Sequence, residues 1–222
     1  MPRSRSLAAS AALASAAAVA AILAGVLPAP GPAAAAIGEK DYPDWPCVQR
    51  KVLTLTSTQI WDGPPVDDIK DWSNEDEVLK LVQGLASRRV PMTDAAASIK
   101  SYAAKLPEAQ RDEKLKRLFA GVLARINEER TSVIGGVERF QRRQKLRAEE
   151  IERQSSEIIK LKEQAKDDAS RKALADAEEK YTWDARVFQE RQQNIPLACE
   201  IPVAIEARAF ELGREIRTHM SK

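Results

Sequence analysis

Hydrophobic residues recur at helical spacing through most of the chain after residue 72. Over residues 119–165 they occupy the a and d positions of one heptad frame, which predicts a long amphipathic helix. The apolar positions are Phe119, Leu123, Ile126, Val133, Val137, Phe140, Ile151, Ile158, Leu161 and Ala165, and the polar interruptions are Arg130, Gln144, Arg147 and Gln154. We expect Pro107 to be the first residue of this helix. Gly135 and Gly136 together lower helix propensity by about 2 kcal/mol relative to alanine, which predicts a kink or break there.

Two shorter helices are predicted before the long one. Ser73 with Asp76 three residues later forms a capping pattern, and the helix that follows should end near Arg89, before Pro91. Thr93 is expected to cap the second helix, whose apolar stripe consists of Ala96, Ile99, Ala103 and Leu106.

Two further helices are predicted after the long one. Ser170 is a candidate N-cap for an arm with the stripe Leu174, Ala177, Tyr181 and Phe188. This arm can fold back on the long helix as an antiparallel hairpin; the alternative is an unbroken rod that would need dimerisation to cover its apolar seams. Pro202 is expected to open a last helix, which would pack on residues 74–126 through Ile205, Ala209, Leu212 and Ile216.

The predicted fold is all-α, with a small helical body and a projecting, coiled-coil-like hairpin. We divide the chain into a signal peptide (1–36), a wrapping segment rich in proline and tryptophan (37–72), the helical body (73–137), the charged hairpin (138–194) and a C-terminal segment and helix that pack on the body (195–222). One short helix through Val48, Val52 and Leu55 is expected in the wrapping segment. Its tryptophans Trp45 and Trp61 are predicted to be either buried anchors or an exposed ligand platform.

The N-terminus is typical of an export signal. Arg3 and Arg5 precede an apolar run that reaches Leu27, and a cut after Ala36 would follow the small-residue rule. The alternative is an uncleaved inner-membrane anchor, since the run is just long enough to span. Removing the segment leaves 33 basic residues against 33 acidic ones, so the mature charge is near zero and does not favour nucleic acid.

The chain has two cysteines, Cys47 and Cys199, near the two ends of the mature protein. In an oxidising compartment two lone thiols predict one disulfide, which would tie these ends together. The sequence therefore predicts a periplasmic or secreted protein.

The block from Asp44 to Val52, DWPCVQRKV, is followed by Trp61 and Gly63. It resembles a segment that recurs in uncharacterised exported proteins of proteobacteria. The resemblance implies a periplasmic setting and no particular substrate.

Few residues are suited to catalysis. The single histidine, His219, lies at the C-terminus, which excludes histidine-based triads and metal sites. There is no C-x-x-C pair and no glycine-rich phosphate motif. Carboxylates occur together at Asp41 and Asp44, at Asp67 and Asp68, and at Asp167 and Asp168, without the order of a calcium loop. We expect no catalytic residue, metal or cofactor.

The predicted function is protein interaction in the cell envelope; the alternative is an enzyme that uses carboxylates in a groove beside the tryptophans. Candidate interaction residues are Trp45, Trp61 and the seam residues near the hairpin tip, Ile158, Leu161, Leu174 and Tyr181. If the two arms bury the seam, it is structural instead. A basic cluster could contact anionic lipid or cell-wall polymer, or simply be a salt-bridged helix surface; it consists of Arg139, Arg142, Arg143, Lys145 and Arg147.

Overall fold

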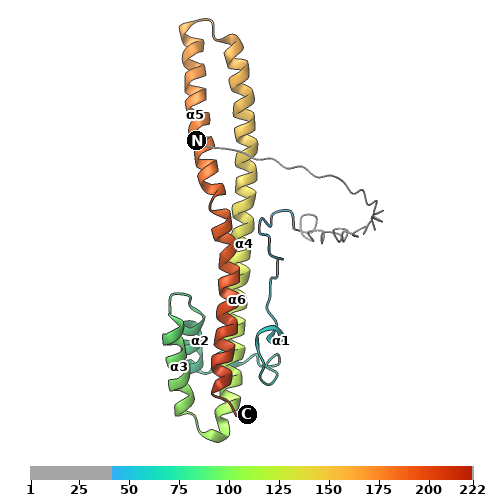
Figure 1. The fold of residues 1–222 in the computed structure, drawn as a ribbon, viewed down its shortest axis with the longest axis vertical. Helices are drawn as coiled ribbons and strands as arrows, with labels where there is room; N and C mark the ends of the chain where they lie inside the picture. The colour runs from blue at the N-terminus through green and yellow to red at the C-terminus, as the bar shows by residue number, and fades with distance from the viewer. Residues whose placement is uncertain (1–41, 222) are drawn as a thin grey trace, which may run out of the picture. The chain divides into compact units, whose positions relative to one another are not determined.

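The computed structural model describes residues 42–221, and within them every regular element is helical (Figure 1). The predicted signal segment and the first residues of the wrapping segment lie outside the described residues. The elements are α1 (Ser57–Ile60), a short 3-10 helix η1 (Trp72–Asn74), α2 (Asp76–Ala86), α3 (Met92–Lys105), α4 (Glu108–Gln164), α5 (Asp168–Gln192) and α6 (Ile195–Thr218). The predicted all-α fold is confirmed.

One long helix organises the described chain. α4 has 57 residues, so it is about 85 Å long at 1.5 Å per residue. α5 packs against the second half of α4, and α6 continues the return path against its first half (Figure 1). The chain therefore folds back on itself as an antiparallel hairpin. α2 contacts α4, and α3 contacts α6, which places the short helices beside the end of the hairpin that carries the C-terminus.

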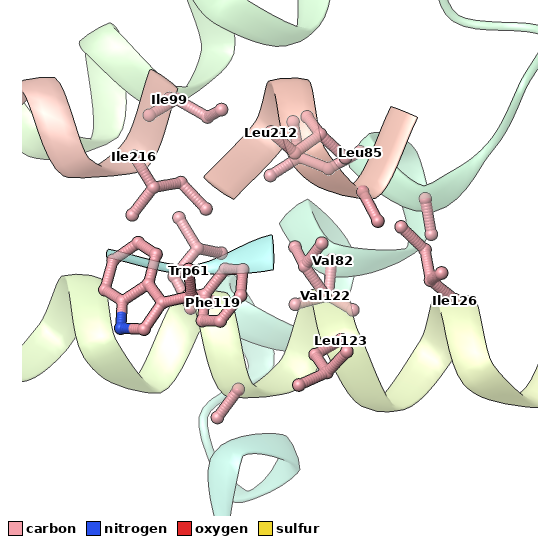
Figure 2. Close-up of a cluster of buried hydrophobic side chains, with 14 of the residues drawn as sticks. Trp61, Val82, Leu85, Ile99, Phe119, Val122, Leu123, Ile126, Leu212 and Ile216 are labelled. Atoms are coloured by element: carbon pink, nitrogen blue, oxygen red, sulfur yellow. The ribbon is translucent and has the colours of Figure 1, made fainter. Parts of the chain in front are cut away.

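The main core lies where α2, α3, α4 and α6 meet (Figure 2). The side chains of Ile205, Ala209, Leu212 and Ile216 are at most 1% exposed, so the predicted inner face of α6 is confirmed. Trp61 stacks on Phe119 with ring centroids 4.1 Å apart, which brings the wrapping segment into the same core. Gly213 permits this packing, because a Cβ there would lie 2.8 Å from the carbonyl oxygen of Ile60.

The predicted helix through Val48, Val52 and Leu55 is wrong. These residues are not helical, and only Ser57–Ile60 forms a helical turn. The reason is tertiary, because backbone groups in this segment bond to side chains of α4 instead of to one another.

Several predicted helix starts are also corrected. Ser73 lies in η1, and the N-cap of α2 is Glu75. α2 ends at Ala86, earlier than the predicted Arg89. Pro91 precedes α3 as its N-cap, so Thr93 is inside the first turn. Pro107 precedes α4 as its N-cap rather than being its first residue.

Two further corrections concern the hairpin. Asp167 is the N-cap of α5, and the predicted cap Ser170 is its partner three residues later in a capping box. α6 already begins at Ile195, so Pro202 lies inside it rather than opening it.

The predicted break at Gly135 and Gly136 is absent, and α4 continues through both residues. Ile134 and Val137, on either side of the pair, are buried. Burial of this apolar face offsets the low helix propensity of the glycines, as tertiary packing often does.

Candidate functional site

We call residues 42–56 the strap, because this non-helical segment lies along α4 and α6 (Figure 1). At its C-terminal end, the Leu55 N–H donates to Asn127 Oδ1 at 2.8 Å, and Asn127 Nδ2 donates to the Leu55 carbonyl at 2.9 Å. A side-chain amide thus replaces the strand partner that an extended backbone would otherwise need.

Arg130 of α4 joins the strap to α6. Its Nε donates to the Val52 carbonyl at 2.9 Å, and its Nη1 donates to the Pro202 carbonyl at 2.7 Å. The side chain is only 4% exposed, and burial lowers the pKa of Arg130, which Glu206 at 3.4 Å partly opposes. The hydrogen bonds of Arg130 compensate the cost of burying its charge.

Ion pairs fix the rest of the strap on α4. Asp44 accepts hydrogen bonds from Arg142 at 3.0 Å and Lys145 at 3.3 Å. The hydrogen bond from Arg142 is the main reason that the pKa of Asp44 lies below its ordinary 3.8. Lys51 pairs with Glu138 at 2.5 Å.

The disulfide between Cys47 and Cys199 anchors the strap to α6. It is confirmed with a Cα–Cα distance of 5.5 Å and a sequence separation of 152 residues. Gln49 Nε2 also donates to the carbonyl of Cys199, so a covalent bond and a hydrogen bond hold the strap at the same turn of α6.

A largely apolar groove runs between the strap and α6, beside these contacts. It consists of two adjoining cavities of about 500 and about 660 Å³, which share Gln49, Val203 and Ala207. The first lies over the disulfide, and the second extends past Trp45 to Phe210. Volumes of this size are typical of binding sites.

The floor of the groove is the outer face of α6. Val203, Ala207 and Phe210 follow helical spacing on the side opposite the core residues, and Val203 and Phe210 are 52% and 44% exposed. Glu200 and Glu206 line the α6 side, and Arg50 lines the strap side. The helix is therefore apolar on two opposite faces, of which only one faces the core.

The two candidate tryptophans have different surroundings. Trp61 is 8% exposed and donates from Nε1 to the Pro64 carbonyl at 2.7 Å, which makes it a core anchor. Trp45 is half-buried, donates from Nε1 to the Gln49 carbonyl at 2.8 Å and lines the groove.

The predicted seam residues of the hairpin face the partner arm to different degrees. Ile158 is buried, while Leu161, Leu174 and Tyr181 are half-buried. The seam also contains polar residues. Gln154, only 8% exposed, donates from Nε2 to Asp184 Oδ2 of the other arm at 2.8 Å. Packing between the arms thus accounts for this surface.

The residues of the predicted basic cluster do not share the same partners. Arg142 and Lys145 bind Asp44 of the strap, and Arg147 lies 3.8 Å from Asp184 of α5. Arg139 and Arg143 are exposed on α4. The cluster is therefore not one uniform surface.

The carboxylate pairs serve local structure where they can be described. Asp67 accepts a hydrogen bond from Ser57, Asp167 caps α5, and Asp168 pairs with Arg171. Asp41 lies outside the described residues. His219 contacts Glu215 at 3.0 Å. Within residues 42–221, no group of three His, Cys, Asp or Glu side chains is placed to hold a metal ion. No helix of that same part of the chain is long and apolar enough to cross a membrane.

Comparison of the chain with protein-family models, with curated proteins and with solved structures found no match. The resemblance of the block at residues 44–52 to exported proteobacterial proteins therefore stays a prediction. A groove beside the tryptophans was expected only as the site of the alternative enzyme, and its apolar floor on α6 was not predicted. The helical spacing of Val203, Ala207 and Phe210 is a signal from which this second apolar face of α6 could have been found.

Proposed function

We propose that this chain is an exported, non-catalytic protein of the cell envelope that binds an amphipathic helix of another protein in the groove between the strap and α6. The observation that carries the proposal is the second apolar face of α6, through Val203, Ala207 and Phe210, beside a preformed cavity. Exposed apolar surface of this kind in a charged protein marks contact sites.

The groove is built to keep its shape without a ligand. The disulfide fixes the strap at one end, and the buried Arg130 fixes it to both α4 and α6. A preformed site loses less conformational entropy on binding, which favours affinity.

The dimensions and charges of the groove favour a helical occupant. From Pro196 to Phe210 the outer face of α6 extends about 20 Å, which matches about four turns of a partner helix. Glu200 and Glu206 lie on the α6 side and Arg50 on the strap side, so the partner helix should carry a basic residue toward α6 and an acidic residue toward the strap.

Export is supported by the disulfide, because such bonds persist in oxidising compartments. The lining of the groove favours binding over catalysis. Its carboxylates come only from Glu200 and Glu206, and Glu206 lies against the Arg130 guanidinium at 3.4 Å.

The test is site-specific photo-crosslinking in cells that produce the full chain. A photoreactive residue at position 203 lies in the groove, and one at position 159 provides a matched control, because Ile159 is similarly exposed on the hairpin. We expect a discrete protein adduct from position 203 only. The adduct protein is then purified and its affinity for the chain measured with and without the substitution Val203→Asp, which should abolish binding without lowering the melting temperature.

Other outcomes overturn the proposal. The same adducts from positions 203 and 159 would indicate unspecific contact. An adduct of twice the chain mass at position 203 would show that a second copy occupies the groove. Binding of the purified adduct protein that is unchanged by Val203→Asp would place the contact elsewhere.

A further inference from the structure

Another cavity lies on the flank of the hairpin, between α4 and α5, away from the groove. It has a volume of about 390 Å³ and is lined by three arginines, Arg143, Arg147 and Arg191. Arg143 and Arg147 come from α4, whereas Arg191 comes from the end of α5. The fold therefore brings Arg191 to the same cavity as Arg143 and Arg147, from which it is far apart in the sequence.

The carboxylates of this cavity are bound by other groups. Asp184 accepts from Lys180 at 2.7 Å and from Gln154 at 2.8 Å, which are both closer than Arg147 at 3.8 Å. Glu150, in turn, pairs with Arg153 at 2.6 Å and accepts from Gln154. Within residues 42–221, no carboxylate lies within 4.0 Å of the guanidinium of Arg143 or Arg191.

The spacing of the arginines is unfavourable for the helix itself. Arg139, Arg143 and Arg147 follow one another at intervals of four residues, so like charges are neighbours on one ridge of α4. Like charges at this spacing destabilise a helix, whereas opposite charges stabilise it. α5 shows the opposite arrangement, with ion pairs four residues apart that begin at Lys172, Lys180 and Arg186.

An anion in the cavity would compensate this repulsion. A guanidinium donates two parallel hydrogen bonds to a phosphate, and several arginines around one cavity are the arrangement that phosphate recognition uses. Leu146 and Ile151 also line the cavity, and Leu146 is 64% exposed. A molecule that carries the anionic group would therefore contact these apolar side chains beside the arginines.

We propose that this cavity is a binding site for a phosphate group, held by Arg143, Arg147 and Arg191, with the group that carries the phosphate packed on Leu146 and Ile151. The site is separate from the groove, and the proposal does not depend on whether a partner helix binds in the groove. Two sources have this chemistry, a phospholipid headgroup and a free phosphate compound.

The test uses two probes with the purified protein. Inorganic phosphate is titrated calorimetrically, and co-sedimentation is measured with vesicles of mixed phosphatidylglycerol and phosphatidylcholine, with pure phosphatidylcholine as the reference. The test variant is Arg143→Gln with Arg191→Gln. The control is Arg171→Gln with Arg186→Gln, which removes the same charge from exposed positions of the same hairpin.

We expect the test variant to lose affinity by about tenfold or more, since each removed guanidinium takes away charge-assisted hydrogen bonds, while the control keeps its affinity. Loss with the vesicle probe identifies a lipid headgroup as the source, and loss with inorganic phosphate identifies a free phosphate compound. The test variant should also melt no lower than the unmodified protein, because like-charge repulsion is relieved.

Three results would overturn the proposal. Equal losses in the test and control variants would show that the general charge of the hairpin, not the cavity, attracts the probe. Absence of binding to both probes would leave the arginines without a phosphate ligand. A clearly lower melting temperature of the test variant, with unchanged affinity, would assign Arg143 and Arg191 a structural role.

Discussion

The buried Arg130 joins three elements, so its removal tests how the strap is held. The substitution Arg130→Met keeps most of the side-chain volume and removes both hydrogen bonds, to Val52 at 2.9 Å and to Pro202 at 2.7 Å. Each hydrogen bond from a charged donor contributes about 1.5 to 3 kcal/mol. The substitution also removes the cost of keeping a charged guanidinium away from water, which offsets part of the lost hydrogen-bond energy. We expect a net loss of about 3 kcal/mol in the free energy of unfolding.

The assay is urea unfolding followed by far-ultraviolet circular dichroism, with hydrogen exchange to localise the effect. Amide protection should fall first at Leu55, whose N–H is held by Asn127 one turn away on α4. Arg130→Lys should lose about 2 kcal/mol, because an ammonium group cannot donate in two fixed directions. Arg153→Met is the exposed control and should change stability by less than about 0.5 kcal/mol. A loss below about 1 kcal/mol for Arg130→Met would refute the reasoning.

Three further predictions concern the hairpin, the disulfide and the strap. Ile158→Asn should lower the melting temperature, because its side chain is 8% exposed between the arms; an unchanged melting curve would show that the seam is not packed. Replacing Cys47 and Cys199 with serine should lower the free energy of unfolding by up to about 5 kcal/mol, and reductant should then have no further effect; equal stability of the two proteins would contradict this. Asp44→Asn should weaken strap protection in hydrogen exchange at neutral pH. Since the hydrogen bond from Arg142 depresses the folded pKa of Asp44, the difference should begin to shrink as the pH falls below 3.8 and disappear once the pH is below the depressed folded pKa. A difference that persists at still lower pH would refute the ion pair.

Helical periodicity predicted those elements whose apolar stripe faces the core. The stripe from Ile205 to Ile216 and the positions around Phe119 and Ile126 are buried as expected. The helix faces that local spacing marks as apolar are the faces that pack into the core there. The disulfide was predictable from the two cysteines together with the expected export signal. Packing between distant segments was not encoded in local spacing, which is why the pair Gly135 and Gly136 was wrongly expected to break α4.

The strap shows the limit of local patterns most clearly. Val48, Val52 and Leu55 have helical spacing, yet the segment is held in a non-helical form by Asn127 and Arg130, more than 70 residues away. No short-range signal carries that information. A groove beside the tryptophans was expected only in general terms, because its walls depend on how this strap lies on α6. The arginine cavity needs α5 beside α4, although the like-charge spacing on α4 was visible in the sequence.

The central claim is that a protein partner covers the outer face of α6. The most direct measurement is carbene footprinting of the full chain in intact cells, compared with the purified protein. The account predicts that labelling of Val203 and Phe210 falls several-fold in cells, while labelling of Ile159 and Trp183, which are 60% and 65% exposed on the hairpin, stays the same. Equal labelling of Val203 and Phe210 in both samples would contradict it.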